Sequence, residues 1–304
     1  MADTPANPAT RAAPASPAPP VEHVLTVDCP EAPGIVHAVT RYLVDHGCDI
    51  VDNQQFGDRR GGHFFMRVRF TSAAAGGGDD TGVLRRDFAA VAAPFAMRWR
   101  LEPADSRRRV LIMVSRYGHC LNDLLFRASS GDLPIDVVAV VSNHSDHEAL
   151  AQWYGIPYFH LPVTAATKGA AEERLLGIVD ELGAELVVLA RYMQVLSDGL
   201  CAQLAGRLIN IHHSFLPSFK GAKPYHQAYE HGVKVVGATA HYVTAELDEG
   251  PIIAQEVIGV DHTHTPEDLV AVGRDVESAA LVKAVRWHCE GRVVVHGRRT
   301  VVLQ

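Results

Sequence analysis

The chain contains 304 residues, of which 47% are hydrophobic and 21% charged, and its 35 acidic and 28 basic residues give a net charge of −7. This length allows about two ordinary domains, and the composition excludes a chain that is disordered throughout. The acidic balance disfavours nucleic-acid binding, which relies on Lys and Arg contacts to phosphates. No apolar run approaches the roughly 18 residues that a membrane-spanning helix needs, so we expect neither a nucleic acid nor a membrane as a partner.

Residues 1–20 consist mainly of Ala, Pro, Thr and Ser and contain no Leu, Ile, Val or Phe. Because such a segment cannot bury a core, we predict a disordered tail, and the tail lacks the pattern of a signal peptide. The five cysteines are scattered without a C-x-x-C pair, which argues against a disulfide framework or a zinc ribbon. Together these features indicate a cytoplasmic protein.

Residues 21–103 show the pattern of a small domain with the element order β-α-β-β-α-β, the ferredoxin-like arrangement. The expected elements are strands at 21–29, 48–56, 63–70 and 95–103, and helices at 35–46 and 83–95. Gly47 is expected to end the first helix. The polar residues 104–109 are the predicted linker to a second domain at 110–304.

The second domain reads as an open, mostly parallel α/β sheet. Short apolar runs at 110–115, 136–142, 185–190 and 207–213 are typical of strands buried on both faces, and further strands are expected at 235–243 and 252–260, with helices at 168–182 and 266–290. Thr265 and Pro266 form a favourable start for the last helix. The chain has no G-x-G-x-x-G, Walker, H-E-x-x-H or G-x-S-x-G motif, which disfavours dinucleotide, ATP, zinc-protease and serine-hydrolase chemistry.

Asn210 and His212 stand at the end of one of these strands, where α/β sheets place reactive groups. Two residues apart on a strand, they point to the same side. Asn can donate to a developing oxyanion, and His can transfer a proton near neutral pH. The alternative is a turn asparagine and a core histidine. His212 and His213 should not chelate one metal ion, because neighbours on a strand point to opposite faces.

Two loops follow this strand. The first, at 214–226, is shaped by Pro217, Gly221 and Pro224, and loops at strand ends often carry function. The second is the acidic segment at 246–251, which reads Glu-Leu-Asp-Glu-Gly-Pro. Such a segment is usually a solvated turn, but a carboxylate that folds back toward the Asn-His strand could orient a water molecule.

The run at 210–255 resembles the catalytic core of the formyltransferase family that uses 10-formyltetrahydrofolate. In that family an Asn-x-His motif precedes the Asp of an L-D-x-G-P loop, and Asn210, His212 and Asp248 match these positions. The resemblance extends over residues 110–304. The segment at 29–56 resembles the small ACT regulatory domain, and an ACT domain ahead of a formyltransferase-like domain is typical of the members that hydrolyse their substrate.

The related glycinamide ribonucleotide transformylases hold the phosphate of their acceptor on a Gly- and Ser-rich loop after the first strand. Here the loop at 115–122 keeps only Gly118 and carries bulky side chains, so we do not expect a phosphate cradle. The resemblance then implies hydrolysis of 10-formyltetrahydrofolate by water to formate and tetrahydrofolate, without a tightly bound cofactor. Formyl transfer to an amine such as glycinamide ribonucleotide and a non-catalytic folate or amino-acid sensor are the alternatives.

The resemblance also implies roles for individual residues. Asn210 would donate to the formyl oxygen, His212 would stabilise the same intermediate, and Asp248 would position water and favour a charged His212. The folate would lie against two segments and would be supported by residues of the first loop. The folate-binding candidates are Tyr192, Met193, Gln194, Val195, Leu196, Thr244, Ala245, Glu246 and Leu247, and the supporting residues are His213, Gly221, Tyr225 and His226. Gln194 stands where these enzymes commonly have Arg.

ACT domains often bind a small amino acid between two copies of the domain, which would make the protein a homo-oligomer. The candidate effector residues are Asp28, Gly34, Ile35, Asn53 and Gln54. They surround the end of the first strand and the start of the first helix, whose N-terminus could receive a carboxylate. A purely structural dimerisation module is the alternative. A role in the one-carbon pool and in formate supply to purine synthesis is implied by the resemblance alone.

Overall fold

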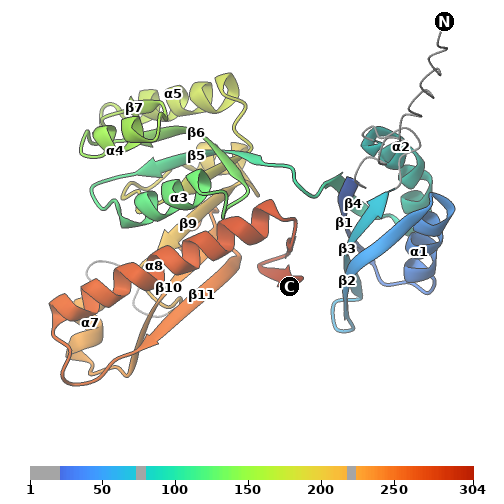
Figure 1. Cartoon of the computed structure of the whole chain (residues 1–304). Coiled ribbons are helices and arrows are strands. Elements are labelled where there is room, and N and C mark those ends of the chain that lie inside the picture. Colours follow the sequence, from blue (N-terminus) through green and yellow to red (C-terminus); the bar gives the residue numbers. More distant parts are fainter. Residues whose placement is uncertain (1–20, 73–79, 218–223) are drawn as a thin grey trace, which may run out of the picture.

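The computed structural model describes residues 21–72, 80–217 and 224–304, so the expected tail at 1–20 lies outside the described residues. Figure 1 shows a small N-terminal domain joined by one extended segment to a larger domain built around a second sheet. None of the helices in the described part of the chain has the length and apolar character that a membrane span requires.

The small domain has the predicted βαββαβ order. Its elements are β1 (Val21–Pro30), α1 (Ile35–Asp45), β2 (Cys48–Asp58), β3 (His63–Ser72), α2 (Thr81–Ala92) and β4 (Arg98–Pro103), with a 3-10 turn at Ala93–Phe95. The antiparallel sheet has the order β2-β3-β1-β4. Leu25, Val27 and Cys29 alternate along β1 and are buried in the core that also holds the apolar residues of α1 and α2, as the period of two predicted.

The larger domain contains a seven-stranded sheet with the order β11-β10-β9-β8-β5-β6-β7. Its strands are β5 (Arg108–Val114), β6 (Ile135–Ser142), β7 (Tyr158–His160), β8 (Leu186–Leu189), β9 (Leu208–His212), β10 (Val235–Tyr242) and β11 (Ile252–Gly259). The five strands from β9 to β7 are parallel, whereas β10 and β11 pair antiparallel. The mostly parallel sheet is therefore confirmed. Because β5 begins at Arg108, the connection after β4 is shorter than the expected linker at 104–109.

Helices cover both faces of this sheet (Figure 1). They are α3 (His119–Ser129), α4 (Glu148–Trp153), α5 (Lys168–Glu181), α6 (Asp198–Gln203), α7 (Pro224–Glu230) and α8 (Pro266–Cys289). Along β5, Ile112 is buried in one core and Met113 in the core on the opposite face, which explains the continuous apolar run in the sequence. Thr265 caps α8 through a reciprocal hydrogen-bonded box with Asp268, as expected.

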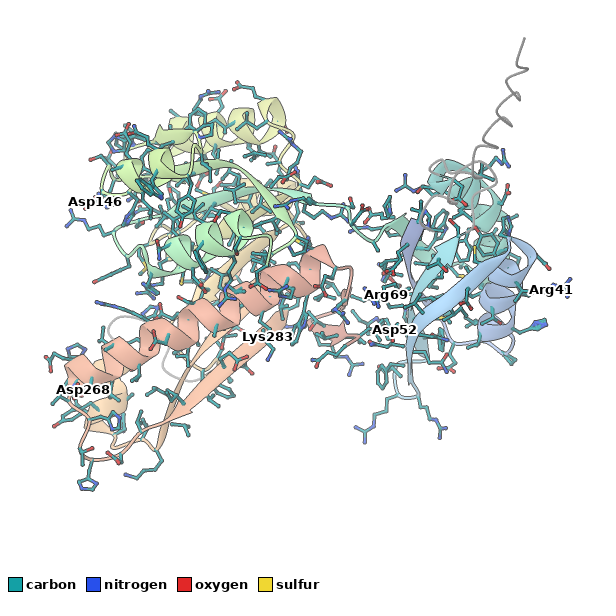
Figure 2. All side chains as sticks on the ribbon, viewed as in Figure 1. Arg41, Asp52, Arg69, Asp146, Asp268 and Lys283 are labelled. Carbon is teal, nitrogen blue, oxygen red and sulfur yellow. The ribbon has the colours of Figure 1, made fainter. Side chains whose placement is uncertain are left out.

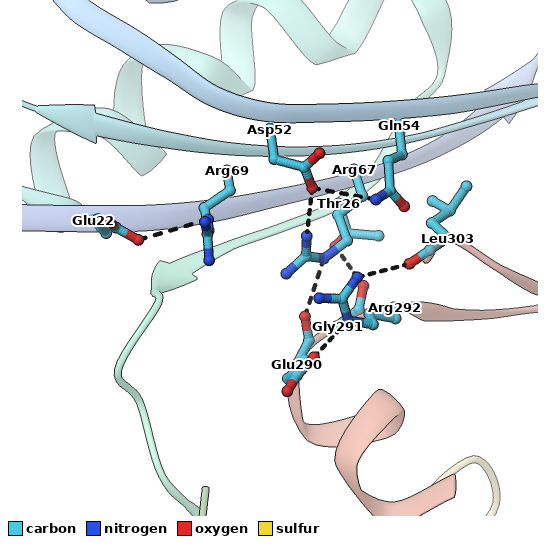
Figure 3. A network of polar contacts seen from close by, with 10 residues as sticks. All are labelled: Glu22, Thr26, Asp52, Gln54, Arg67, Arg69, Glu290, Gly291, Arg292 and Leu303. Carbon is cyan, nitrogen blue, oxygen red and sulfur yellow. Dashed lines mark hydrogen bonds and ion pairs between the residues drawn. The ribbon is translucent and has the colours of Figure 1, made fainter. Parts of the chain in front are cut away.

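A C-terminal hairpin, which was not predicted from the sequence, packs against the small domain and brings the two domains into contact. It consists of β12 (Val293–His296) and β13 (Arg299–Val302). Val294 and Leu303 form a small apolar cluster with Phe65 of the ACT-like sheet, and Phe65 is fully buried. Figure 3 shows the polar contacts beside it, where Arg67 Nε donates to the Glu290 carbonyl at 3.2 Å and Thr26 Oγ1 donates to the Gly291 carbonyl at 3.0 Å.

Charged side chains surround both domains. Figure 2 places Arg41 on the outer side of the small domain, whereas Asp52 and Arg69 lie on its side that faces the larger domain. Arg67 reaches Asp52 at 3.5 Å, and Arg69 reaches Glu22 at 3.6 Å. These ion pairs add polar contacts around the apolar hairpin cluster.

Candidate active site

Asn210 and His212 both lie on β9, between the parallel strand β8 and the antiparallel strand β10. Their side chains line one cavity of about 340 Å³ at the carboxyl end of the parallel strands. The same-side placement follows from the period of two in an extended strand. The structure therefore brings the two predicted groups to one site.

Asp248 comes to the same cavity from the loop between β10 and β11. Its Oδ2 lies 3.2 Å from His212 Nδ1, and its Oδ1 lies 3.6 Å from His241 Nε2. Asp248 has a φ of +56°, a conformation that non-glycine residues seldom adopt and that is enriched at functional sites.

Gly250 explains why this acidic loop can lie so close to β10. A Cβ at this position would stand 1.7 Å from the carbonyl oxygen of Tyr242, so any other residue would force the backbone apart. The Tyr242 amide also donates to the Pro251 carbonyl at 2.9 Å. The Gly-Pro pair thus closes the loop against the strand and carries Asp248 inward.

The protonation states of Asp248 and His213 depend on burial and on the charges of neighbouring side chains. Burial alone would raise the pKa of the Asp248 carboxyl, but hydrogen bonds and charge from His212 and His241 outweigh it and hold that pKa well below its usual range. Burial, together with the positive charge of Arg191, lowers the pKa of His213 to about 4. At neutral pH the site therefore holds an ionised carboxylate next to His212 and a neutral imidazole at His213.

His241 is a site residue that the sequence reasoning missed. It lies opposite Asn210 in the β9–β10 pairing, and its Nε2 is 3.2 Å from the Asn210 amide nitrogen. Its Nδ1 lies 2.9 Å from the Tyr242 carbonyl oxygen. The signal in the sequence is weak, because only the strand register places His241 beside Asn210.

The Nε2 of His212 is a buried ring nitrogen without a hydrogen-bond partner within the described part of the chain. The other ring nitrogen, Nδ1, faces Asp248. A buried polar atom without a partner is costly. Because the imidazole lines the cavity, a ligand there could supply that partner.

Most of the predicted folate-binding residues line this cavity. Met193 is fixed through its backbone, since its N–H donates to Ser115 Oγ at 2.9 Å, and Ser115 Oγ donates to Asn143 at 2.7 Å. Glu246 lies apart from them, near the exposed Arg298 at 3.7 Å. The predicted residues that line the cavity are Tyr192, Met193, Gln194, Val195, Leu196, Thr244, Ala245 and Leu247.

The predicted supporting residues take different positions. His213 lines the cavity, and its ring lies 6.3 Å from that of the buried Tyr225. His226 is exposed on α7, and Gly221 lies outside the described residues. Two of the four supporting residues therefore belong to the surroundings of the site.

A buried carboxylate behind the cavity was also missed by the sequence reasoning. Glu277 of α8 is 1% exposed. One of its oxygens accepts from Tyr225 Oη at 2.7 Å, and the other lies 2.7 Å from His119 Nε2 and 3.3 Å from Arg191 Nε. A single acidic residue in a long helix gives no signal of this role, because four separate segments meet there.

His119, Cys120 and Glu277 place potential metal-ligand atoms within 4.8 Å of one another. Burial, with the charge of Glu277, raises the pKa of the Cys120 thiol well above its usual range, which disfavours the thiolate that a metal needs. Because Glu277 already bonds His119 and Tyr225, we assign no metal to this group.

The five predicted effector residues come from three segments of the small domain. Asp28 on β1 pairs with His63 at 3.1 Å and Arg98 at 2.7 Å. Asn53 and Gln54 lie on the edge strand β2, which β3 separates from β1. Gly34 precedes α1 with a φ of +92°, and Ile35 is buried.

Both domains match known families. Residues 23–76 match the ACT domain and residues 108–285 match the formyl transferase family. The chain is 61% identical to the formyltetrahydrofolate deformylase of Corynebacterium sp. (strain P-1), over 93% of this chain and 99% of that one. The crystal structure of formyltetrahydrofolate deformylase from Burkholderia mallei ATCC 23344 is similar, with a TM-score of 0.89 and 51% identity over 94% of this chain and 100% of that one. Glycinamide ribonucleotide transformylase 1 from Symbiobacterium toebii has a TM-score of 0.62 and 33% identity over 67% of this chain and 98% of that one.

Proposed function

Because the chain belongs to the formyltetrahydrofolate deformylase family, we propose that it hydrolyses 10-formyltetrahydrofolate to formate and tetrahydrofolate. The observation that carries this proposal is the meeting of Asn210, His212 and Asp248 at one cavity, with the last two 3.2 Å apart. An oxyanion donor, an imidazole and a carboxylate are the groups that hydrolysis of a formamide uses. The enzyme is a hydrolase that acts on a carbon–nitrogen bond.

In the proposed reaction, Asp248 is ionised at neutral pH and positions the water whose oxygen adds to the formyl carbon. Asn210 donates an amide hydrogen to the resulting oxyanion, and His212 donates to it from Nε2. The bond between the formyl carbon and N10 then breaks, one proton of the added water passes to N10 and the other is released to solvent, and formate and tetrahydrofolate leave the site. Pre-positioned donors of this kind typically contribute about 2.7–4 kcal/mol each.

The substrate would enter the cavity with its pterin against residues 192–196 and 244–248. Main-chain groups in these segments can read the edge of the ring while apolar side chains pack on its faces. Gln194 supplies no charge for the folate tail. The reaction needs no tightly bound cofactor in this scheme, since the residues named supply the proton transfer and the charge stabilisation.

Formyl transfer to a phosphorylated amine is disfavoured by the surroundings of α3. His119 is the first residue of this helix and is held by the buried carboxylate of Glu277. The imidazole of His119 is therefore already paired, and the loop at 115–122 offers only Gly118 for a close backbone approach to a phosphate.

The decisive experiment measures formate and tetrahydrofolate after the purified protein is mixed with 10-formyltetrahydrofolate and no acceptor. We expect equal amounts of both products, and we expect Asp248→Asn to abolish them while leaving the circular dichroism spectrum unchanged. Glu249→Gln, which alters a neighbouring carboxylate near Arg298, is the matched control. Products that form only after glycinamide ribonucleotide is added would establish a transferase instead.

The ACT domain is a small-molecule sensor in this proposal, with an amino acid bound between two copies of the chain in a homo-oligomer. Calorimetric titration with each of the twenty amino acids tests it, and heat or a rate change is expected for at least one. We place the reaction in the cytoplasm, where cysteines such as the five free ones of this chain stay reduced.

A further inference from the structure

Arg191 is a buried cation at the edge of the active-site cavity, and its guanidinium makes few hydrogen bonds. It is 9% exposed, and its Nε and Nη1 have no hydrogen-bond partner among the residues that the structure describes. Its guanidinium lies over the ring of Tyr117 at 5.4 Å. Burying a guanidinium without hydrogen bonds is costly, so the arrangement favours a ligand that completes it.

Glu277 balances this charge only in part. The carboxylate forms its two short contacts with His119 and Tyr225, both at 2.7 Å, whereas Arg191 Nε stands at 3.3 Å without hydrogen-bond geometry. The neighbouring His213 is neutral at pH 7, because its pKa is lowered to about 4. Among the described residues, Arg191 therefore keeps donors without a hydrogen-bond partner next to the cavity that it lines.

Arg191 lines the cavity from the segment that follows β8. It lies two residues after the end of this strand with a φ of +63°, and its carbonyl accepts from the Ser115 amide at 3.3 Å. Among the described residues that line the cavity with Asn210, His212 and Asp248, Arg191 is the only Lys or Arg. Unusual backbone conformations of this kind persist where the surrounding structure enforces them.

We propose that Arg191 forms the subsite for the carboxylate of the formate product. This inference rests on the proposed hydrolysis, in which water adds to a neutral formamide, the carbon–N10 bond breaks and the one-carbon fragment leaves as an anion. The flat, forked guanidinium matches a carboxylate with two donors. The same positive charge favours the negative charge that develops on the formyl oxygen before the bond breaks.

Titration of the folate-free protein with ¹³C-formate, followed by NMR and compared with sodium chloride at equal ionic strength, tests the subsite without turnover. We expect saturable binding by the wild type and at least about tenfold weaker binding by Arg191→Gln. Arg191→Lys keeps the positive charge but loses the paired donors of the guanidinium, so its affinity for formate should lie between those of the wild type and Arg191→Gln. Arg116→Gln removes an exposed charge from the loop after β5 and should bind formate like the wild type.

The same variants should change product inhibition of the hydrolase, with the inhibition constant for formate rising in Arg191→Gln and unchanged in Arg116→Gln. No saturable binding of formate to the wild type, or binding by Arg191→Gln that equals that of the wild type, overturns the subsite. Formate binding through Arg191 in a protein that releases no formate from 10-formyltetrahydrofolate would instead refute the hydrolysis and leave an anion site. The two proposals can therefore fail separately.

Discussion

The Nδ1 of His212 lies 3.2 Å from a carboxylate oxygen of Asp248, although the two residues are 36 positions apart in the sequence. Two structural features produce this contact. The antiparallel pairing of β9 with β10 places His241 opposite Asn210, and Gly250 lets the loop after β10 lie against Tyr242, so that its carboxylate Asp248 reaches His212. The carboxylate can therefore orient the imidazole while the other ring nitrogen stays available to a ligand.

Replacing Asn210 tests the oxyanion donor. Asn210→Ala should lower kcat by about 10²–10³-fold, because loss of one such donor typically costs about 2.7–4 kcal/mol in the barrier. KM should change much less, since the donor acts on a charge that develops only in the transition state. Asn122→Ala, on the exposed side of α3, is the control. Steady-state formate release measures both, and an Asn210→Ala enzyme within a few-fold of the wild type would remove Asn210 from the mechanism.

Replacing Gly250 tests whether the loop that carries Asp248 must pack closely against Tyr242. Gly250→Ala should destabilise the protein by about 1–3 kcal/mol and reduce activity, because the new Cβ overlaps the Tyr242 carbonyl and displaces Asp248. Gly259→Ala lies in open space at the end of β11 and should be nearly neutral. Urea denaturation and formate release measure the two effects. Equal stability of the two variants would show that the loop relaxes freely.

Acidification should destabilise the folded protein through His213 and Asp248. The pKa of His213 falls from its usual 6.5 to about 4 on folding, so the unfolded chain binds more protons and stability is lost as the pH falls from about 6.5 toward 4. The pKa of Asp248 is also lowered, so its contribution is present above the unfolded value near 4 and is lost below it.

Urea denaturation of the wild type and of His213→Asn at a series of pH values from 7.5 down to about 3 measures this effect. The variant should lose less stability than the wild type between pH 6.5 and 5. The pH dependence below 4, to which Asp248 contributes, should be retained. Parallel stability curves for the two proteins across this range would contradict a neutral His213 in the folded state.

Replacing Phe65 tests the contact between the hairpin and the ACT domain. Phe65→Ala should cost about 3–5 kcal/mol, because it removes a fully buried ring from between Val294 and Leu303. Phe126→Ala, which truncates a side chain that is 59% exposed, should have little effect. Hydrogen exchange of β12 and β13 should increase in the first variant alone, and unchanged protection would show that the hairpin does not depend on this contact.

The sequence by itself determined most of the elements and pointed to the three proposed catalytic residues. The apolar run of β5, the alternation in β1 and the Thr265 cap of α8 are local patterns, and each predicts its element without knowledge of the rest of the chain. Asn210, His212 and Asp248 could be found because they belong to a motif with characteristic spacing. The C-terminal hairpin was missed because its two strands of four residues are too short for a clear period.

Only the tertiary structure decided which side chains meet. His241 reaches Asn210 through the register of β10, and Glu277 reaches Arg191 because α8 packs behind the end of β8. Phe65 joins Val294 through the contact between domains. Such contacts depend on the packing of segments that are distant along the chain, and local periodicity carries no information about that packing. The proposed catalytic residues could therefore be chosen from the sequence, whereas the charged and polar groups around them were decided by the packing of distant segments.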